Sequence, residues 1–145
     1  MKLSNKQIVI EHSALNLFNI VLDLKKYPDF IPWCSNMNII SKKNNEIFAD
    51  MYVVYKFLLP QKFGSHVVFD KKKIIIKTTY INGPLKDLST NWEFVSISKT
   101  RTQINFNIKF QFKNFLHQKL AETFYPLIEN KMIKSFENRA NQLFN

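Results

Sequence analysis

The chain ends in its longest helical pattern, which extends from Asn114 to Asn145. Apolar residues recur there at every fourth position and many of the intervening residues are charged or polar, as in an amphipathic helix. The apolar positions are Leu116, Leu120, Phe124, Ile128, Met132, Phe136 and Ala140. Such a helix is not stable alone in water and needs an apolar partner surface. The rest of the chain must provide that surface, which restricts the folds it can adopt.

The apolar stripe does not run straight along this helix. A step of four residues overshoots a 3.6-residue turn by about 40°, so the stripe winds around a straight helix. Pro126 lies in the middle and cannot donate a hydrogen bond to the carbonyl of Glu122. Two geometries would let both halves face one surface: a kink near Glu122 to Pro126, or a gentle curvature that follows a twisted sheet.

The segment before the helix, Thr102 to Phe112, has the clearest strand pattern in the chain. Five apolar residues alternate with polar ones, namely Ile104, Phe106, Ile108, Phe110 and Phe112. Alternation of this kind indicates an antiparallel sheet with one buried face and one face in water. The buried face of such a sheet is the partner surface that the final helix requires.

Other segments complete a simple order of elements. Strands are expected at Lys6–Glu11, Ser35–Lys42, Ile47–Leu58, Phe63–Asp70, Ile74–Ile81 and Leu88–Ser98. Between the first two, Ser13 can cap a helix that ends before Tyr27 and Pro28. The expected fold class is therefore α+β. A curved antiparallel sheet of about six to seven strands wraps around the C-terminal helix, in a single domain spanning residues 1–145.

The segment from Tyr27 to Cys34 (YPDFIPWC) is an unusual connector. Two prolines restrict its backbone, yet it carries four large apolar side chains, those of Tyr27, Phe30, Ile31 and Trp33. A solvent-exposed loop would not normally contain so many large apolar side chains. The connector must pack against the body of the protein or face a ligand.

Composition excludes several classes of protein. With only two glycines, the glycine-rich phosphate loops of nucleotide-binding folds are absent. A lone cysteine, Cys34, cannot form an internal disulfide and indicates a reducing compartment. No apolar run approaches the ~18 residues of a membrane span, and the N-terminus is too polar for a secretory signal. We therefore expect a cytoplasmic protein that is at most peripheral to the inner membrane.

The net charge is +10, and Arg101 and Arg139 are the only arginines among 21 basic residues. Arginine provides the bidentate contacts on which specific base recognition depends, so we do not expect DNA binding. A lysine-dominated excess produces a diffuse positive field that suits anionic surfaces in general. A surface that drifted toward lysine without a specific partner is the favoured explanation of the charge. An anionic membrane surface and RNA are the partners left open.

Four segments carry a resemblance to a known family. They are YPDFIPWC at Tyr27–Cys34, NGPLKDLSTNWEF at Asn82–Phe94, FNIKFQF at Phe106–Phe112 and MIKSFENRANQLF at Met132–Phe144. Their order resembles the coenzyme Q-binding proteins (oligoketide cyclase/lipid transport, polyketide cyclase superfamily), a branch of the START-like domains with a helix-grip fold. The bacterial ribosome-association toxins are a related branch that shares several of these patterns. The toxins usually carry a smaller residue at the position of Trp33, which favours the coenzyme Q-binding branch, and Leu85 replaces the usual Phe after Gly-Pro.

The resemblance implies a cavity between the sheet and the final helix that accepts ubiquinone or another lipid as bound ligand, with no other cofactor. Composition alone favours a core filled by these side chains, whereas the resemblance favours a cavity. The side chains expected to contact a ligand are Trp33, Met51, Val53, Tyr55, Phe69, Ile76, Trp92, Phe94, Phe106, Ile108, Phe110, Phe124, Ile128 and Met132. Aromatic rings can stack on a quinone head group. Trp33, close to Lys25 and Lys26, would also suit a membrane interface.

No pattern indicates catalysis. His12, His66 and His117 are far apart in the chain and lack metal-ligand spacing, and no base is signalled beside Cys34, which we expect to be a small buried apolar residue. The expected function is non-catalytic binding of a hydrophobic molecule, most plausibly ubiquinone, in support of respiratory electron transport. The alternatives are a toxin-like protein that binds the large ribosomal subunit and, more weakly, a polyketide cyclase-like enzyme.

Overall fold

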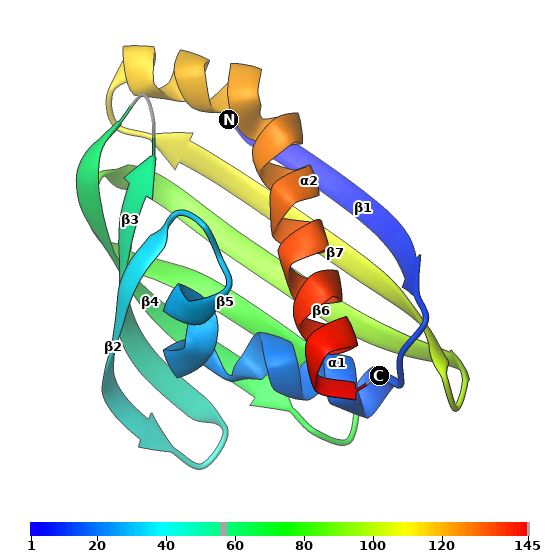
Figure 1. Ribbon diagram of the computed structural model, residues 1–145. Coiled ribbons are helices and arrows are strands. Elements are labelled where there is room, and N and C mark those ends of the chain that lie inside the picture. Colours follow the sequence, from blue (N-terminus) through cyan, green and yellow to red (C-terminus); the bar gives the residue numbers. More distant parts are fainter. Residues whose placement is uncertain (56–57, 145) are drawn as a thin grey trace.

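The computed structural model describes residues 1–55 and 58–144. Within these ranges, seven strands form one antiparallel sheet in the order β1-β7-β6-β5-β4-β3-β2. The strands are β1 (Lys2–Ile10), β2 (Cys34–Lys43), β3 (Glu46–Tyr55), β4 (Leu58–Asp70), β5 (Ile75–Asn82), β6 (Leu85–Ser98) and β7 (Arg101–Phe112). The helices are α1 (Ala14–Leu22), the 3₁₀ helix η1 (Leu24–Asp29) and α2 (Phe115–Phe144). The predicted α+β helix-grip architecture is confirmed: the sheet curves around α2 (Figure 1).

Several strands are longer than the sequence pattern predicts. Strand β1 begins at Lys2 because its first residues pair with β7, beginning with Lys2 opposite Phe110. Strand β6 begins at Leu85, which pairs with Phe112. Pro60 does not precede β4 but lies inside it, at a register shift where the strand pairing is irregular. A proline is tolerated at such a place because no ladder hydrogen bond requires its missing N–H.

The two glycines lie where the sheet bends. A register shift separates Gly64 from Ser65, and a Cβ atom at Gly64 would lie 2.5 Å from Oδ1 of Asn82. Gly83, with φ of 137°, forms the turn between β5 and β6, where a Cβ atom would lie 2.5 Å from the carbonyl oxygen of Lys62. Irregularities of this kind increase local twist and bend the strands. They help the sheet to form the concave face that receives α2.

The lower end of the concave face in Figure 1 is closed by α1. Ser13 caps this helix as predicted, because its side chain accepts a hydrogen bond from the amide of Asn16 at 3.2 Å. Phe18 is fully buried, with its ring centroid 6.4 Å from that of Phe69 and 5.9 Å from that of Phe94. This aromatic contact fills the space between α1 and the sheet with side chains.

The connector packs against the body of the protein, as its apolar content requires. Ile31 is buried, and the rings of Tyr27 and Phe30 lie 5.5 Å and 5.4 Å from that of Phe136 in α2. Contacts between centroids at these distances are favourable edge-to-face arrangements. The connector therefore fixes the lower half of α2 to the sheet.

The upper half of α2 departs from the predicted stripe. Asn114 caps the helix by accepting hydrogen bonds from the amides of Leu116 and His117. The side chain of Leu116 is 64% exposed, so its predicted burial is wrong. Gln118 takes the inward position instead, because its Oε1 atom accepts a hydrogen bond from the amide of Phe112 at 2.7 Å. Figure 1 shows that α2 changes direction within its orange section, to which Pro126 belongs, in agreement with a kink.

Candidate ligand-binding cavity

A cavity of about 240 Å³, here called the main cavity, lies between α2 and the concave face of the sheet. One wall comes from the connector, β3 and β4, through Trp33, Met51, Val53 and Phe63. The floor comes from β6 and β7, through Leu85, Leu88, Phe106, Ile108, Phe110 and Phe112. The third wall is α2, through Leu120, Ala121, Phe124, Tyr125, Ile128, Glu129 and Met132. The space under the final helix is therefore hollow rather than filled.

A smaller cavity of about 140 Å³ lies beside the main one, toward η1 and the lower part of the sheet. Four side chains line both spaces, those of Trp33, Met51, Phe106 and Met132, and we call these the partition residues. Two of them are methionines, whose unbranched side chains change rotamer readily. Half of the partition between the two cavities is therefore built from adaptable side chains.

Most of the side chains predicted to contact a ligand meet at these two cavities. Nine line the main cavity: Trp33, Met51, Val53, Phe106, Ile108, Phe110, Phe124, Ile128 and Met132. Trp92 lines the smaller cavity, with its ring 4.5 Å from that of Phe106. Their role as ligand contacts stays a prediction.

Three predicted residues fall elsewhere. Phe69, Ile76 and Phe94 line neither cavity but belong to the core, where Phe18 of α1 contacts the rings of Phe69 and Phe94. The strand pattern could not separate them from the others because they point to the same concave face. The side chain of Tyr55 lies outside the described residues.

The main cavity also contains a polar group that the sequence analysis did not select. Glu129 is only 6% exposed, and its Oε2 atom accepts hydrogen bonds from the Tyr125 hydroxyl at 2.5 Å and the Ser4 hydroxyl at 3.2 Å. Burial and the neighbouring Glu129 raise the pKa of Tyr125, so this phenol stays protonated and remains a donor. The cavity therefore carries one hydrogen-bonded carboxylate in an otherwise apolar wall.

This pair was missed because it lies beside the stripe of every fourth residue. Leu120, Phe124 and Ile128 of that stripe do line the cavity. The buried positions from Tyr125 onward are Tyr125, Glu129, Phe136 and Ala140, with the half-buried Met132 between them, so the steps are four, three, four and four residues. A heptad-like spacing of this kind keeps residues on one face of a helix, whereas a strict step of four does not. Testing the helix against that spacing would have identified both residues.

The histidines and the cysteine lie apart from the cavities. Nε2 of His12 lies 2.7 Å from Oδ1 of Asn141, and His66 pairs with Glu46 at 2.9 Å. His117 is half-buried, with its ring centroid 6.1 Å from that of Phe112. Cys34 is buried as predicted, and burial raises the pKa of its thiol to about 11, which disfavours the nucleophilic thiolate. Among the described residues, no three or more His, Cys, Asp or Glu side chains gather as metal ligands.

In the part of the chain that the structure describes, no helix is both long enough and apolar enough to span a bilayer.

An apolar cavity enclosed by a curved antiparallel sheet and a long C-terminal helix defines the START-like, helix-grip class. The chain belongs to the family described as polyketide cyclase / dehydrase and lipid transport, whose sequence model matches residues 10–137.

Two relatives in this group carry names that point to different functions. The ribosome association toxin RatA of Rickettsia prowazekii is 33% identical over 138 residues, and the match covers 93% of each chain. The mitochondrial coenzyme Q-binding protein COQ10 homolog B of Xenopus laevis is 25% identical over 140 residues, with 94% of this chain and 57% of that protein covered. Both branches that the motifs indicated are therefore represented among the relatives.

Solved structures agree on the fold. The Zhui aromatase/cyclase of Streptomyces sp. R1128 superposes with a TM-score of 0.90 at 12% identity, covering 99% of this chain and 96% of that one. A START superfamily protein of Mycobacterium smegmatis superposes with a TM-score of 0.85 at 17% identity, covering 97% and 98%. At these identities the likeness concerns the fold alone.

Proposed function

We propose that this protein binds an apolar, lipid-like molecule in the main cavity and carries or protects it without chemical change. The observation that supports this proposal is the main cavity between α2 and the sheet. Apart from Trp33, Tyr125 and Glu129, all side chains that line it are apolar. Covering this surface with an apolar ligand removes it from water, which is favourable by about 25 cal/mol per Å² of apolar area buried. Among the described residues that line the main cavity there is no Cys, His, Ser or Lys side chain, which makes a cyclase reaction the weaker alternative.

Within this proposal, the ligand is an isoprenoid quinone such as ubiquinone. The coenzyme Q-binding relative supports this choice by its name. Sites for drug-sized ligands usually measure about 300–1,000 Å³, more than the 240 Å³ of the main cavity. A longer ligand would have to displace the partition residues and extend into the smaller cavity. The mobile side chains of Met51 and Met132 make that displacement inexpensive.

Loading from a membrane would suit the upper end of the protein. The first turn of α2 exposes two large apolar side chains, with Phe115 75% and Leu116 64% exposed. Two exposed lysines, Lys113 and Lys119, flank them, and the amine of Lys119 lies 5.5 Å from the centre of the Phe115 ring. Apolar side chains beside lysines are suited to an anionic lipid surface. The next turn continues into the cavity through Leu120 and Phe124.

One experiment tests both parts of this proposal. Purified protein is incubated with anionic vesicles that contain an isoprenoid quinone, separated from them, extracted with organic solvent and assayed by mass spectrometry. We expect about one quinone per protein, and slower loading when Phe115 and Leu116 are both replaced by serine. Repeated absence of any bound quinone or lipid would refute cavity binding. Equal loading rates for the two proteins would refute the membrane contact alone.

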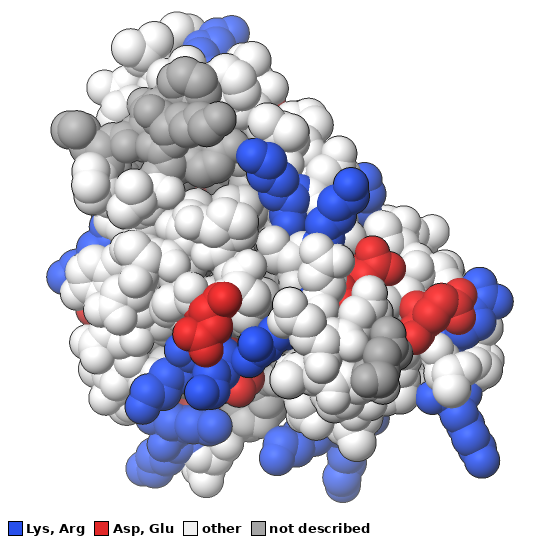
Figure 2. Space-filling model, viewed as in Figure 1, with Lys and Arg blue, Asp and Glu red and all other residues white. Residues whose placement is uncertain are grey.

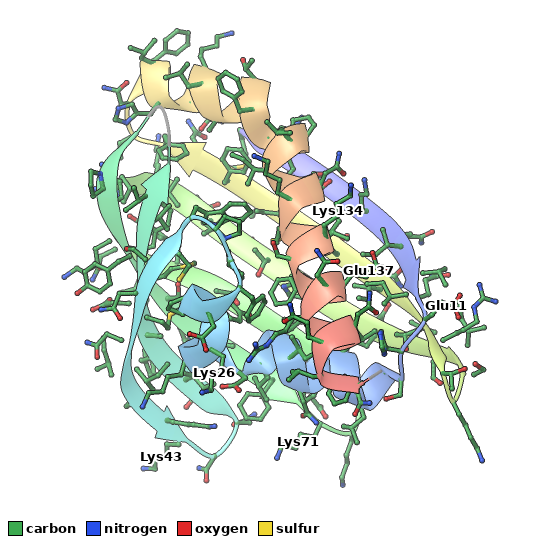
Figure 3. All side chains as sticks on the ribbon, viewed as in Figure 1. Glu11, Lys26, Lys43, Lys71, Lys134 and Glu137 are labelled. Atoms are coloured by element: carbon green, nitrogen blue, oxygen red, sulfur yellow. The ribbon has the colours of Figure 1, made fainter. Side chains whose placement is uncertain are left out.

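Association with ribosomes is a second candidate, because the Rickettsia relative is named for it and the surface carries a lysine-rich end. Figure 2 shows lysines gathered over the lower end of the molecule, and Figure 3 labels Lys26, Lys43 and Lys71 there. The turns after β2 and β4 meet at this end, since the Phe69 amide donates to the Asn45 carbonyl. The exposed lysines of the lysine-rich end are Lys25, Lys26, Lys42, Lys43, Lys71, Lys72 and Lys73.

Co-sedimentation with ribosomal subunits tests this candidate. Binding through lysine–phosphate contacts releases counterions, so affinity should fall steeply between about 50 and 200 mM salt. Replacing Lys72 and Lys73 by glutamate should weaken binding at least tenfold. The same change at Lys131 and Lys134, on the outer face of α2, serves as a control of equal charge. Failure to co-sediment at low salt would exclude this function.

A further inference from the structure

Glu129 is the one carboxylate among the described residues that line the main cavity. It comes from the middle of α2 and is 94% removed from solvent, since only 6% of its surface is exposed. A buried carboxylate is costly unless several donors satisfy its oxygens. The contacts of this group therefore indicate what a ligand would have to supply.

The hydrogen bonds of Glu129 are unevenly distributed over its two oxygens. Oε2 accepts both the Tyr125 and the Ser4 hydroxyl, whereas Oε1 accepts no hydrogen bond from the described residues. Oε1 is also not among the fully enclosed polar atoms that lack a partner, so it borders free space. Because Glu129 lines the main cavity, a donor on a ligand in that cavity could approach the carboxylate.

The donors around Glu129 are already used. The Tyr125 hydroxyl donates to Oε2 at 2.5 Å and the Ser4 hydroxyl donates to the same atom at 3.2 Å. This end of the cavity therefore presents a negatively charged acceptor and no uncommitted donor from these two residues. A carbonyl or ether oxygen placed against Oε1 would meet another lone pair and be repelled. A hydroxyl group would complete the shell of the carboxylate with a charge-assisted hydrogen bond.

We propose that Glu129, held in place by Tyr125 and Ser4, selects ligands whose head group donates a hydrogen bond, such as phenols and hydroquinones with an apolar tail. This inference rests on the proposed lipid-binding function and narrows it. In a quinone series, the reduced hydroquinone binds at the Glu129 end and the oxidised quinone binds more weakly. The carboxylate acts as a specificity determinant and not as a catalyst, so no bond of the ligand is broken.

The test compares ligands that differ only in the donor. The dissociation constants of 4-nonylphenol and 4-nonylanisole, its methyl ether, are measured by calorimetry on the full chain. A hydrogen bond to a charged group should favour the phenol about tenfold or more. In Glu129→Gln the preference should fall to within about threefold, because the charge is lost at nearly constant volume. The control is Glu137→Gln on the same helix, labelled in Figure 3, which lines neither cavity and should keep the wild-type preference.

The outcomes separate the inference from the function on which it rests. If neither ligand binds the wild-type protein, the proposed function fails and the inference fails with it. If both bind with equal affinity, the cavity function stands and the selection by Glu129 is refuted. If Glu129→Gln does not fold, Glu129→Met takes its place. This variant removes the acceptor at similar side-chain volume, so the phenol preference should fall to within about threefold, and a preference equal to that of the wild type would overturn the inference.

Discussion

Replacing Met51 by tryptophan is expected to lower the affinity for apolar ligands at least tenfold while leaving the protein folded. Met51 lies on β3 and lines both cavities, so a larger side chain there extends into space that a ligand would occupy. Overpacking a dense core costs about 1–3 kcal/mol, but a side chain that grows into a hollow avoids most of that strain. The measurement is a ligand titration combined with thermal unfolding.

The control for this variant lies on the same strand. Val54 follows on β3 within a few residues but is 49% exposed, so it does not point into the cavity. The Val54→Trp variant should bind ligand like the wild-type protein, although it carries the same added ring. Unchanged affinity in the Met51→Trp variant would mean that the ligand binds outside the main cavity.

Replacing Phe136 by alanine should lower the free energy of unfolding by about 3–5 kcal/mol, the usual cost of removing a large buried ring. Phe136 is 4% exposed, and its ring lies 5.4–5.5 Å from the rings of Tyr27, Phe30 and Trp92. One side chain thus joins the connector, the sheet and the lower half of α2. Its loss would leave a cavity that these three neighbours cannot fill without moving.

Urea denaturation measures this effect, with the midpoint and the slope compared between variants. Leu127→Ala is the matched change on the same helix, where the side chain is 49% exposed, and it should alter stability by less than about 0.5 kcal/mol. A loss below about 1 kcal/mol for Phe136→Ala would show that α2 is not anchored through this ring. Either result can be obtained without any knowledge of the ligand.

The fold was largely predictable because its signals are local. In β7, residues Ile104, Phe106, Phe110 and Phe112 are buried and alternate with more exposed polar residues, as the pattern predicted. Alternation in a strand reports directly which face is covered. The ends of the strands were less predictable. The start of β1 at Lys2 depends on pairing with Phe110, a residue far away in the chain.

The candidate site was predictable only in part. The side chains of Phe69 and Phe106 both face the concave side of the sheet, but Phe69 is covered by Phe18 of α1 whereas Phe106 borders both cavities. No pattern along a strand distinguishes these two situations. Whether an inward side chain meets another side chain or a hollow depends on how the helices lie across the sheet.

The sequence by itself determined the order of the elements, the concave apolar face and the amphipathic character of α2. These properties follow from apolar residues that recur at about every second position in the strands and every third or fourth position in α2. Only the tertiary structure decided that the space under α2 is hollow and that Glu129 lines it. Those properties arise from the kinked path of α2 and from the distance at which the connector and Phe136 hold it above the sheet. They are relations between distant segments, and no local pattern encodes them.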